Sequence, residues 1–397
     1  MPDLPVLHQS PTEDAFVQDP YGFYRKARAS CGGAFFWADF GMPAILSFAH
    51  VSAILRDRRF GRTPPPGHEP QKPPHQAGFW AIEDHSMLEL EPPRHTRLRK
   101  QVLRAFTSRR IAGMAPEITA LSHRLVDAIE LGGFDLLPDF ANRLPIIVIA
   151  RLLGVPEDMS DRLLGWSHDM VAMYQAGRTY QTECRASDAA REFADYLADY
   201  ITFRRTRPGD DLITELIAAE EDGDRLSMPE LITTCVLLLN AGHEATVHTI
   251  GNGVAALLTH GCRPEYLAPD GIDATVEEIL RFDTPLHLFH RWAYEDVELG
   301  DMTVPKDSKI ALLLAAANRD PGAWDEPARF DPARPAKTNA SFGAGTHFCI
   351  GAPLARLELK IALPILFARF PGLELAQRPR FAPTYHFHGL ERLVVST

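Results

Sequence analysis

The sequence predicts a mainly α-helical protein with a few small β-sheets at its margins. Apolar residues recur mostly at spacings of three and four, the period of an amphipathic helix, and strand-like runs are short and few. The longest helical pattern covers residues 227–258 and begins with Ser227-Met228-Pro229-Glu230, a capping signal. Because no repeat, low-complexity tract or linker divides the 397 residues, we expect a single domain spanning 1–397.

The other elements follow from the same periodicity. In chain order, helices are expected at residues 21–29, 94–106, 116–129, 140–153, 162–174, 186–206, 211–221, 274–282 and 352–370. Strands are expected at residues 34–37, 44–47, 310–315 and 390–395. Such a pattern places the helices in one large body and leaves the strands to small sheets.

Composition and charge restrict the class of protein. The net charge of -11 disfavours nucleic acid as a partner. Apolar runs such as residues 310–317 are too short to span a bilayer, and residues 1–13 lack the apolar core of a signal peptide. Five cysteines at irregular spacing argue against a disulfide framework. We therefore expect a cytoplasmic protein without a membrane anchor.

Residues 342–351, FGAGTHFCIG, form the most informative segment of the chain. Cys349 ends a glycine-punctuated loop directly before a predicted helix, where the dipole and free N–H groups should lower the pKa of its thiol. Glycines at 343, 345 and 351 allow the backbone to turn and to lie close to a flat partner. From the residues alone, Cys349 could ligate a soft metal, act as a nucleophile, or simply be buried.

The spacing F-x-x-G-x-H-x-C-x-G closely resembles the haem-binding loop of the cytochrome P450 monooxygenases. The resemblance implies the P450 fold, with haem b between the long central helix and the helix after the cysteine. It makes Cys349 the thiolate ligand of the haem iron. It also places Phe342, His347, Gly351 and Ala241 against the cofactor.

A stretch of the long helix, Ala241-Gly242-His243-Glu244-Ala245-Thr246, resembles the oxygen-activating segment of the family, A-G-x-[D/E]-T. Glu244 matches the acid that organises proton delivery, whereas Ala245 stands where threonine is usual. Thr246 follows one residue later and points about 100° away on an ideal helix. Protons would then pass by ordered water, by a substrate hydroxyl, or by Thr246 if the helix is distorted. Some family members carry alanine here, so activity is still expected.

An E-x-x-R pair on a predicted helix, Glu278 and Arg281, would alone be read as a surface ion pair. With Arg334 it resembles the family's Glu-Arg-Arg triad, whose buried arginines pin the cysteine loop. The segment starting at Glu91 resembles D-P-P-x-H-x-x-x-R and implies that His95 and Arg99 meet one haem propionate. Arg291 and His347 are the other propionate contacts that the resemblance implies.

The resemblance also implies where a hydrophobic small-molecule substrate would lie. The expected pocket residues are Trp80, Leu88, Leu237, Leu238, Ala241, Ala245, Leu286, His287, Phe289 and Phe387. His287 and His386 could orient a polar group, or could equally be packed or solvent-facing. Proline-rich residues 64–74 would form a mobile entrance loop.

A monooxygenase of this kind needs electrons, and the chain carries no flavin or iron–sulfur motif. We expect a ferredoxin and its reductase to supply them. They would dock near a basic strip, residues 92–116, which contains no acidic residue. The docking residues expected are Arg97, Lys100, Arg104, Arg109 and Arg356. The competing readings are a peroxide-driven peroxygenase or isomerase-like member, favoured by Ala245, and a non-catalytic haem ligand sensor.

Overall fold

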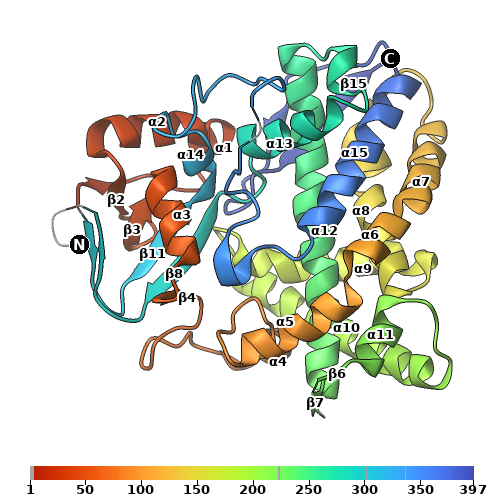
Figure 1. Ribbon diagram of the computed structural model, residues 1–397, viewed down its shortest axis with the longest axis horizontal. Coiled ribbons are helices and arrows are strands. Elements are labelled where there is room, and N and C mark those ends of the chain that lie inside the picture. The colour runs from red at the N-terminus through yellow and green to blue at the C-terminus, as the bar shows by residue number, and fades with distance from the viewer. Residues whose placement is uncertain (1–3, 222–223, 301, 336) are drawn as a thin grey trace.

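One long helix, α12 (Met228–His260), runs through the helical part of the molecule, and other helices pack around it (Figure 1). The structure is a computed structural model that describes residues 4–221, 224–300, 302–335 and 337–397. Ser227 and Glu230 accept each other's backbone N–H in a capping box. The helix ends at His260, and the C-cap residue Gly261 has a φ of 84°. The long helix and its capping signal are therefore confirmed.

The helices that contact α12 form the main core with it. They include α8 (Arg143–Leu153), α10 (Tyr180–Thr206), α13 (Ile272–Phe282) and α15 (Ala352–Arg369). Nearly every residue of α8 is buried, and most of α12 is buried as well. A helix that is apolar on most sides must lie inside the protein. The site therefore has a rigid, densely packed helix as one wall.

Shorter helices complete this body and link it to the sheets. They are α1 (Asp14–Gln18), α2 (Pro20–Cys31), α3 (Phe48–Arg56), α4 (Ala77–Glu83), α5 (Arg94–Ala105), α6 (Ser108–Gly113), α7 (Ala115–Asp127), α9 (Ser160–Val171), α11 (Leu212–Ala218) and α14 (Leu314–Asn318). Single helical turns are η1 (Pro74–Gln76), η2 (Leu137–Ala141), η3 (Glu157–Met159), η4 (Ala172–Tyr174), η5 (Pro264–Tyr266) and η6 (Gly345–His347).

The largest sheet lies to the side of the helices, near the N-terminus (Figure 1). Its order is β1 (Val6–Leu7), β2 (Ala34–Trp37), β3 (Met42–Ile45), β11 (Lys309–Leu313), β8 (Leu288–Ala293) and β4 (Phe60–Gly61). β11 is parallel to β3 and antiparallel to β8, so Ala311 is opposite both Ala44 and His290. This pairing fixes β8, which carries Arg291, against the core of the sheet.

Small sheets account for the other strands. They are β12 (Glu374–Leu375), β15 (Val394–Ser396) and β5 (Gly133–Asp135) in one sheet; β13 (Arg380–Phe381) with β14 (Leu390–Arg392); β9 (Val297–Leu299) with β10 (Met302–Val304); and β6 (Glu220–Glu221) with β7 (Asp224–Arg225). The mainly helical class with small sheets is thus confirmed.

Three predicted elements differ from the structure. The strand expected at 310–315 stops at Leu313, because Leu314 begins the buried helix α14. The strand expected at 390–395 is two strands in different sheets, separated at Leu393, whose N–H donates to Asp135. The helix expected at 211–221 ends at Ala218 and is followed by β6. In each case the element that follows decides where the predicted one ends.

Candidate functional site

The predicted cysteine loop folds as a tight turn directly before α15. Gly343 and Gly345 have φ of 65° and 67°, values that suit glycine. Gly345 also has no room for a side chain, because an added Cβ would lie 2.3 Å from the carbonyl oxygen of Leu55 in α3. The N–H of Cys349 donates to the carbonyl of Phe342 at 3.0 Å. The loop therefore holds Cys349 close to the first turn of α15.

Cys349 is the exposed member of the chain's five free cysteines. Desolvation by the surrounding protein nevertheless raises the pKa of its thiol, while the N–H groups of Gly351 and Ala352 and the charges of Arg99 and Arg356 act to lower it. The prediction of a lowered pKa is therefore wrong, because desolvation outweighs the helix N-terminus. A bound metal ion deprotonates such a thiol outright, so the site fits a metal ligand better than a free nucleophile.

The middle of α12 has one accessible, apolar side. The predicted pocket residues on this helix, Leu237, Leu238, Ala241 and Ala245, are all exposed or half-buried. Ala241 and Ala245 are four residues apart and share a face. Gly242 instead allows α12 to pack closely against α8, because an added Cβ at this residue would lie 3.1 Å from Ile149. The alanines leave α12 flat where a planar cofactor would approach it.

The helix stays regular through this stretch. Thr246 is buried, and its hydroxyl donates to the carbonyl of Gly242 at 3.3 Å. The α-helix continues without interruption from Met228 to His260. The structure therefore does not show the helix distortion on which the Thr246 route depends.

Glu244 is buried on another side of α12, among three histidines. Its carboxylate oxygens lie 3.3 Å from His243 Nε2, 3.5 Å from His248 Nε2 and 3.5 Å from His168 Nε2 of α9. Burial alone would raise its pKa, but the neighbouring imidazoles of His243 and His248 hold the pKa of Glu244 well below its usual range. The sequence analysis did not identify His168, because nothing near it in the sequence indicates that it meets α12.

Two of the four predicted propionate contacts have unused polar groups. Arg291 is 2% exposed and donates to the carbonyl of His290 at 2.8 Å, and no carboxylate of the described residues lies within ion-pair distance. Burial lowers its pKa to about 9. His95 is buried, and its Nδ1 has no partner among the described residues. A buried cation without a carboxylate partner, and a buried ring nitrogen without a partner among the described residues, fit an anionic group such as a propionate.

The other two predicted contacts already have protein partners. Arg99 of α5 donates to the carbonyl of Phe348 in the cysteine loop at 2.7 Å. His347 Nε2 lies 2.9 Å from Glu91 Oε1, and its ring lies 4.5 Å from that of His95. Burial lowers the pKa of His347, and Glu91 acts to raise it. The structure thus brings His95 and His347 together, and it uses Arg99 to stabilise the cysteine loop.

Replacing Arg291 by glutamine should weaken haem retention. A hydrogen bond to a charged group contributes about 1.5–3 kcal/mol, so the rate of haem loss should rise by roughly 10- to 150-fold. The measurement is haem transfer to excess apomyoglobin. Arg369→Gln, at a half-exposed pair with Asp127, is the matched control. Equal rates in both variants, with unchanged circular dichroism, would contradict an anion contact at Arg291.

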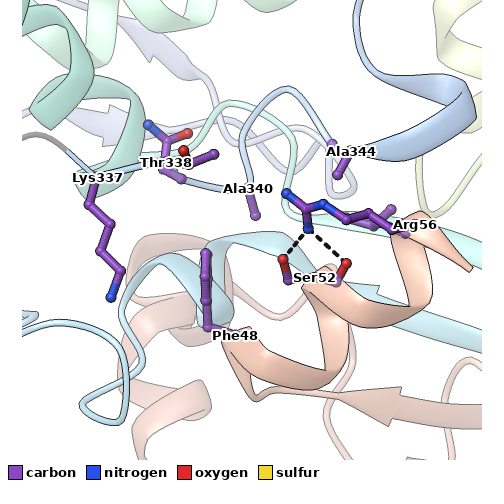
Figure 2. Close-up of a pocket in the computed structure, with 10 residues that line it drawn as sticks. Phe48, Ser52, Arg56, Lys337, Thr338, Ala340 and Ala344 are labelled. Atoms are coloured by element: carbon purple, nitrogen blue, oxygen red, sulfur yellow. Dashed lines mark hydrogen bonds between the residues drawn. The ribbon is translucent and has the colours of Figure 1, made fainter.

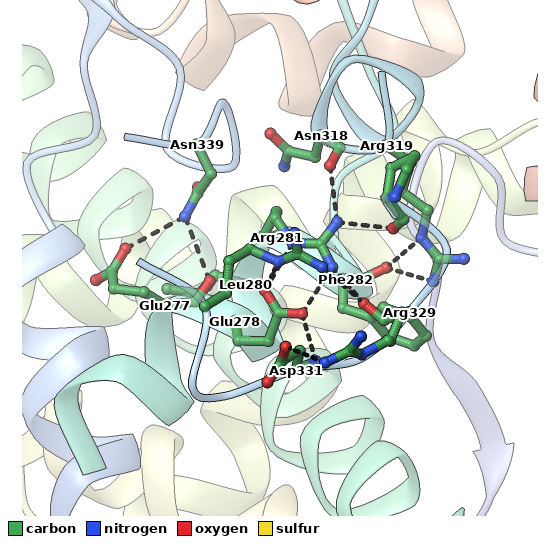
Figure 3. Close-up of polar contacts among 12 residues, drawn as sticks. Glu277, Glu278, Leu280, Arg281, Phe282, Asn318, Arg319, Arg329, Asp331 and Asn339 are labelled. Atoms are coloured by element: carbon green, nitrogen blue, oxygen red, sulfur yellow. Dashed lines mark hydrogen bonds and ion pairs between the residues drawn. The ribbon is translucent and has the colours of Figure 1, made fainter. Parts of the chain in front are cut away.

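Figure 3 shows the polar network around the predicted triad. Glu278 accepts two hydrogen bonds from Arg281, at 2.6 and 2.7 Å, and one from the N–H of Asp331 at 2.7 Å. Arg334 Nε lies 3.5 Å from the same carboxylate. Arg281, 1% exposed, also donates to the carbonyls of Asn318, Pro327 and Arg329. The structure therefore brings all three triad residues together, with Glu278 and Arg281 buried and Arg334 half-buried.

Residues outside the motif connect this network to the cysteine loop. Asn318 donates to Ser341 Oγ at 2.9 Å and accepts from the N–H of Ala340 at 2.7 Å. Ser341 in turn donates to the carbonyl of Leu280 at 2.7 Å. Sequence reasoning missed Asn318 and Ser341, because a single polar residue beside an apolar run gives no signal of a buried role.

One predicted pocket residue is placed differently. His287 is 0% exposed, and its Nδ1 lies 2.9 Å from the hydroxyl of Tyr24. Its ring also packs against Tyr21 and His388. The expectation that His287 contacts substrate is therefore wrong, because it belongs to a closed aromatic cluster. Of the two alternatives to substrate contact, a packed or a solvent-facing side chain, the structure shows the packed one.

The remaining predicted pocket residues are less enclosed. Trp80, Leu88, Leu286, Phe289 and His386 are half-buried, and Phe387 is 8% exposed. Leu286 and Phe387 pair through an isolated antiparallel bridge. Burial lowers the pKa of His386 to about 4, so this imidazole is neutral at physiological pH.

A cavity of about 260 Å³ lies between α3 and the segment leading to the cysteine loop (Figure 2). Phe48 and Ser52 line it on the α3 side, and Lys337 and Ala344 line it on the other. None of the predicted substrate residues is among its lining residues. This cavity is therefore distinct from the predicted substrate site.

The basic strip is partly used inside the protein. Arg97 pairs with Glu230 at the start of α12. Arg356 pairs with Glu277 and lies over the ring of Phe342 at 4.5 Å. The expectation that Arg97 and Arg356 are docking residues needs correction, because both have internal partners. Lys100, Arg104 and Arg109 are exposed on α5 and α6.

These observations together define a class of protein. A mainly helical protein presents an exposed cysteine at a helix N-terminus, with buried basic groups suited to an anionic cofactor. A long helix beside them has a flat alanine face. This is the arrangement of a haem-thiolate protein.

Comparison with known proteins agrees. The family model for cytochrome P450 matches residues 272–386. Cytochrome P450 107B1 of Saccharopolyspora erythraea is 37% identical, covering 96% of each chain, and 6-deoxyerythronolide B hydroxylase of the same organism is 39% identical over 83% of each. The crystal structure of P450BioI with an acyl-ligated acyl carrier protein has a TM-score of 0.90 at 33% identity, covering 97% of this chain and 100% of that one.

The chain belongs to the cytochrome P450 family. It is a monooxygenase whose cofactor is haem with a cysteine ligand, and it receives electrons from a redox partner. Within the described residues, none of the helices is both long and apolar enough to cross a membrane.

Proposed function

We propose that this P450 hydroxylates, or otherwise oxidises, a bulky hydrophobic molecule that carries oxygen functions, with Cys349 as the iron ligand. The observation that carries the proposal is the pairing of an exposed cysteine with an accessible alanine face on α12. One turn of α5 contacts both segments, since Arg99 donates to the cysteine loop and Arg97 pairs with Glu230 at the start of α12. Haem bound there supplies oxygen activation and oxygen insertion into a C–H bond.

The residues around Ala245 support a substrate with a polar group near the reacting carbon. Ala245 has no hydroxyl, and the hydroxyl of Thr246 is bonded to the helix backbone. Glu244 lies on another side of the helix, held by histidines. In this proposal Glu244 is the acid of the proton path, and ordered water or a hydroxyl of the substrate carries the protons between it and the reacting centre. The relative named 6-deoxyerythronolide B hydroxylase and the polyketide biosynthesis P450 PksS favour an oxygenated polyketide as the first class to test.

The electron donor in this proposal is a ferredoxin with its reductase. Lys100, Arg104 and Arg109 form an exposed basic surface that suits an acidic partner. Two exposed apolar side chains, Leu103 on α5 and Phe348 beside Cys349, are 46% and 39% exposed. Apolar contacts within a basic rim are typical of a docking surface. The electrons would then enter on the cysteine side of the cofactor.

The setting of the protein in this proposal is the cytoplasm, with the whole chain as one domain. All five cysteines are free thiols, which suits a reducing compartment. One core cluster contains residues from Phe79 to Val395, which supports a single folding unit.

Titration of the purified holoprotein with a ligand panel tests the substrate class. The panel contains oxygenated macrolactones, terpenoids, simple aromatics, and fatty acids both free and attached to an acyl carrier protein. The expected result is a shift of the ferric Soret band with the macrolactones, and weaker shifts with unoxygenated compounds of equal size. A shift only with the carrier-bound acyl chain, or only with aromatics, would overturn the proposed class.

Turnover of the compound that binds then separates the competing activities. Product formation with ferredoxin, reductase and a nicotinamide donor is expected, and charge reversal at Lys100, Arg104 and Arg109 should reduce it. The same variant should keep its turnover with added peroxide, which needs no docking. Turnover with peroxide alone would instead indicate the peroxygenase, and ligand binding without any product would indicate a sensor.

A further inference from the structure

A cluster of metal-ligating side chains lies where α9 packs on α12, and the proposed function uses only one of its members. His168 comes from α9, and His243 and Glu244 come from α12. One ligand atom from each residue lies within 4.8 Å of the other two. Residues far apart in the sequence thus direct two imidazole nitrogens and a carboxylate oxygen at one point.

The geometry matches the spacing that a zinc ion requires. Glu244 Oε2 lies 3.3 Å from His243 Nε2 and 3.5 Å from His168 Nε2. Zinc binds nitrogen and oxygen at about 2.0–2.2 Å in a tetrahedron, which separates its ligands by about 3.3 Å. The two observed distances therefore already agree with a shared ion.

The buried ligands are held in the form that binds metal. His243 Nδ1 lies 3.0 Å from the carbonyl of Leu239, so Nδ1 carries the proton and Nε2 keeps its lone pair. His243 is 0% exposed, and its Nε2 has no hydrogen-bond partner among the described residues. Glu244 Oε2 is likewise buried without one. His248 Nε2, 3.5 Å from Oε1, holds the other oxygen of this carboxylate.

The side chain of His168 connects the cluster to solvent. The side chain of His168 is 48% exposed, whereas those of His243 and Glu244 are 0% and 10% exposed. A metal ion would therefore arrive at His168 from solvent and complete its shell with water. Two imidazole nitrogens beside one carboxylate suit zinc and similar divalent transition ions, whereas calcium and magnesium prefer a shell of oxygen ligands.

We propose that His168, His243 and Glu244 form a binding site for a divalent transition metal ion of the zinc class. The ion links α9 to α12. Binding itself does not depend on the proposed function. The expected effect on turnover does depend on the proposed function. An ion bound to Glu244 would occupy the carboxylate of the proton path, so turnover should fall as the site fills.

Equilibrium dialysis of the haem-loaded protein against buffered Zn²⁺, with elemental analysis, tests binding directly. One zinc per chain is expected at saturation. His168→Ala should weaken binding by about 10- to 100-fold, the range found even for indirect supports of a metal site. His123→Ala, at an exposed histidine on α7, is the matched control and should bind as the parent does. Equal binding by both variants would overturn the proposal.

Absorption at the zinc edge provides a second measurement that does not depend on activity. The parent should show nitrogen and oxygen ligands at about 2.0–2.2 Å with two imidazoles, and His168→Ala should show one fewer. A spectrum dominated by sulfur would assign the zinc to a cysteine and contradict the site. If zinc binds as expected but turnover is unchanged, the metal site stands and the assignment of Glu244 to the proton path fails.

Discussion

Replacing Cys349 by serine is expected to abolish haem-thiolate chemistry while leaving the fold intact. The residue is exposed and lies outside the packed core, so its loss should cost little stability. Loss of an indirect support of a metal site typically costs about 10- to 100-fold in activity or affinity, and loss of the ligand itself should exceed that. The measurement is the Soret band of the reduced, CO-bound protein together with turnover.

Cys262→Ser is the matched control for this experiment. Cys262 is a half-buried free thiol just beyond the end of α12, away from the cysteine loop. It should keep the thiolate-type Soret band and full turnover. If Cys349→Ser also keeps that band, the iron ligand is a different residue, and the assignment of the site is wrong.

Glu278→Gln is expected to be strongly destabilising although it changes almost no volume. The parent carboxylate neutralises Arg281, which is 1% exposed, and approaches Arg334. Removing one partner of a buried ion pair costs about 3–5 kcal/mol, because the other charge stays buried without compensation. The network reaches the cysteine loop through Asn318, so haem retention should fall as well.

Glu326→Gln provides the comparison for Glu278. Glu326 pairs with Arg329 at the surface, where their side chains are 70% and 57% exposed. Such a pair contributes about 0–1 kcal/mol, so this variant should unfold close to the parent. Denaturant unfolding followed by circular dichroism and by the Soret band measures both effects. Equal midpoints for the two variants would show that the triad charge is not needed for stability.

Local signals predicted the parts of the fold that depend on local chemistry. The strand at 34–37 agrees with β2, and the capping signal at Ser227 agrees with the start of α12. In both, backbone hydrogen bonds and nearby side chains decide the conformation. By contrast, α14 has five buried, mostly apolar residues without periodicity, so it could not be told from a strand.

Predictions for the site follow the same division. The cysteine loop and the triad were found because their residue types and spacing carry the chemistry. Arg97 and Arg356 were expected at the surface, yet each pairs with a carboxylate from another helix. His287 was expected in the substrate pocket, yet Tyr24 binds it in the core. The partner of a side chain depends on which distant segment packs beside it. The residues next to that side chain in the sequence do not specify this segment.

The sequence by itself determined the helical class, the iron ligand candidate, the triad and the missing hydroxyl at Ala245. Each is a matter of residue identity at a fixed short spacing. Only the tertiary structure showed that desolvation raises the pKa of Cys349, that Arg291 is a buried cation with no carboxylate partner among the described residues, and that His168 meets Glu244. Burial and long-range contacts are set when remote helices pack together, so these properties arise only in the folded chain.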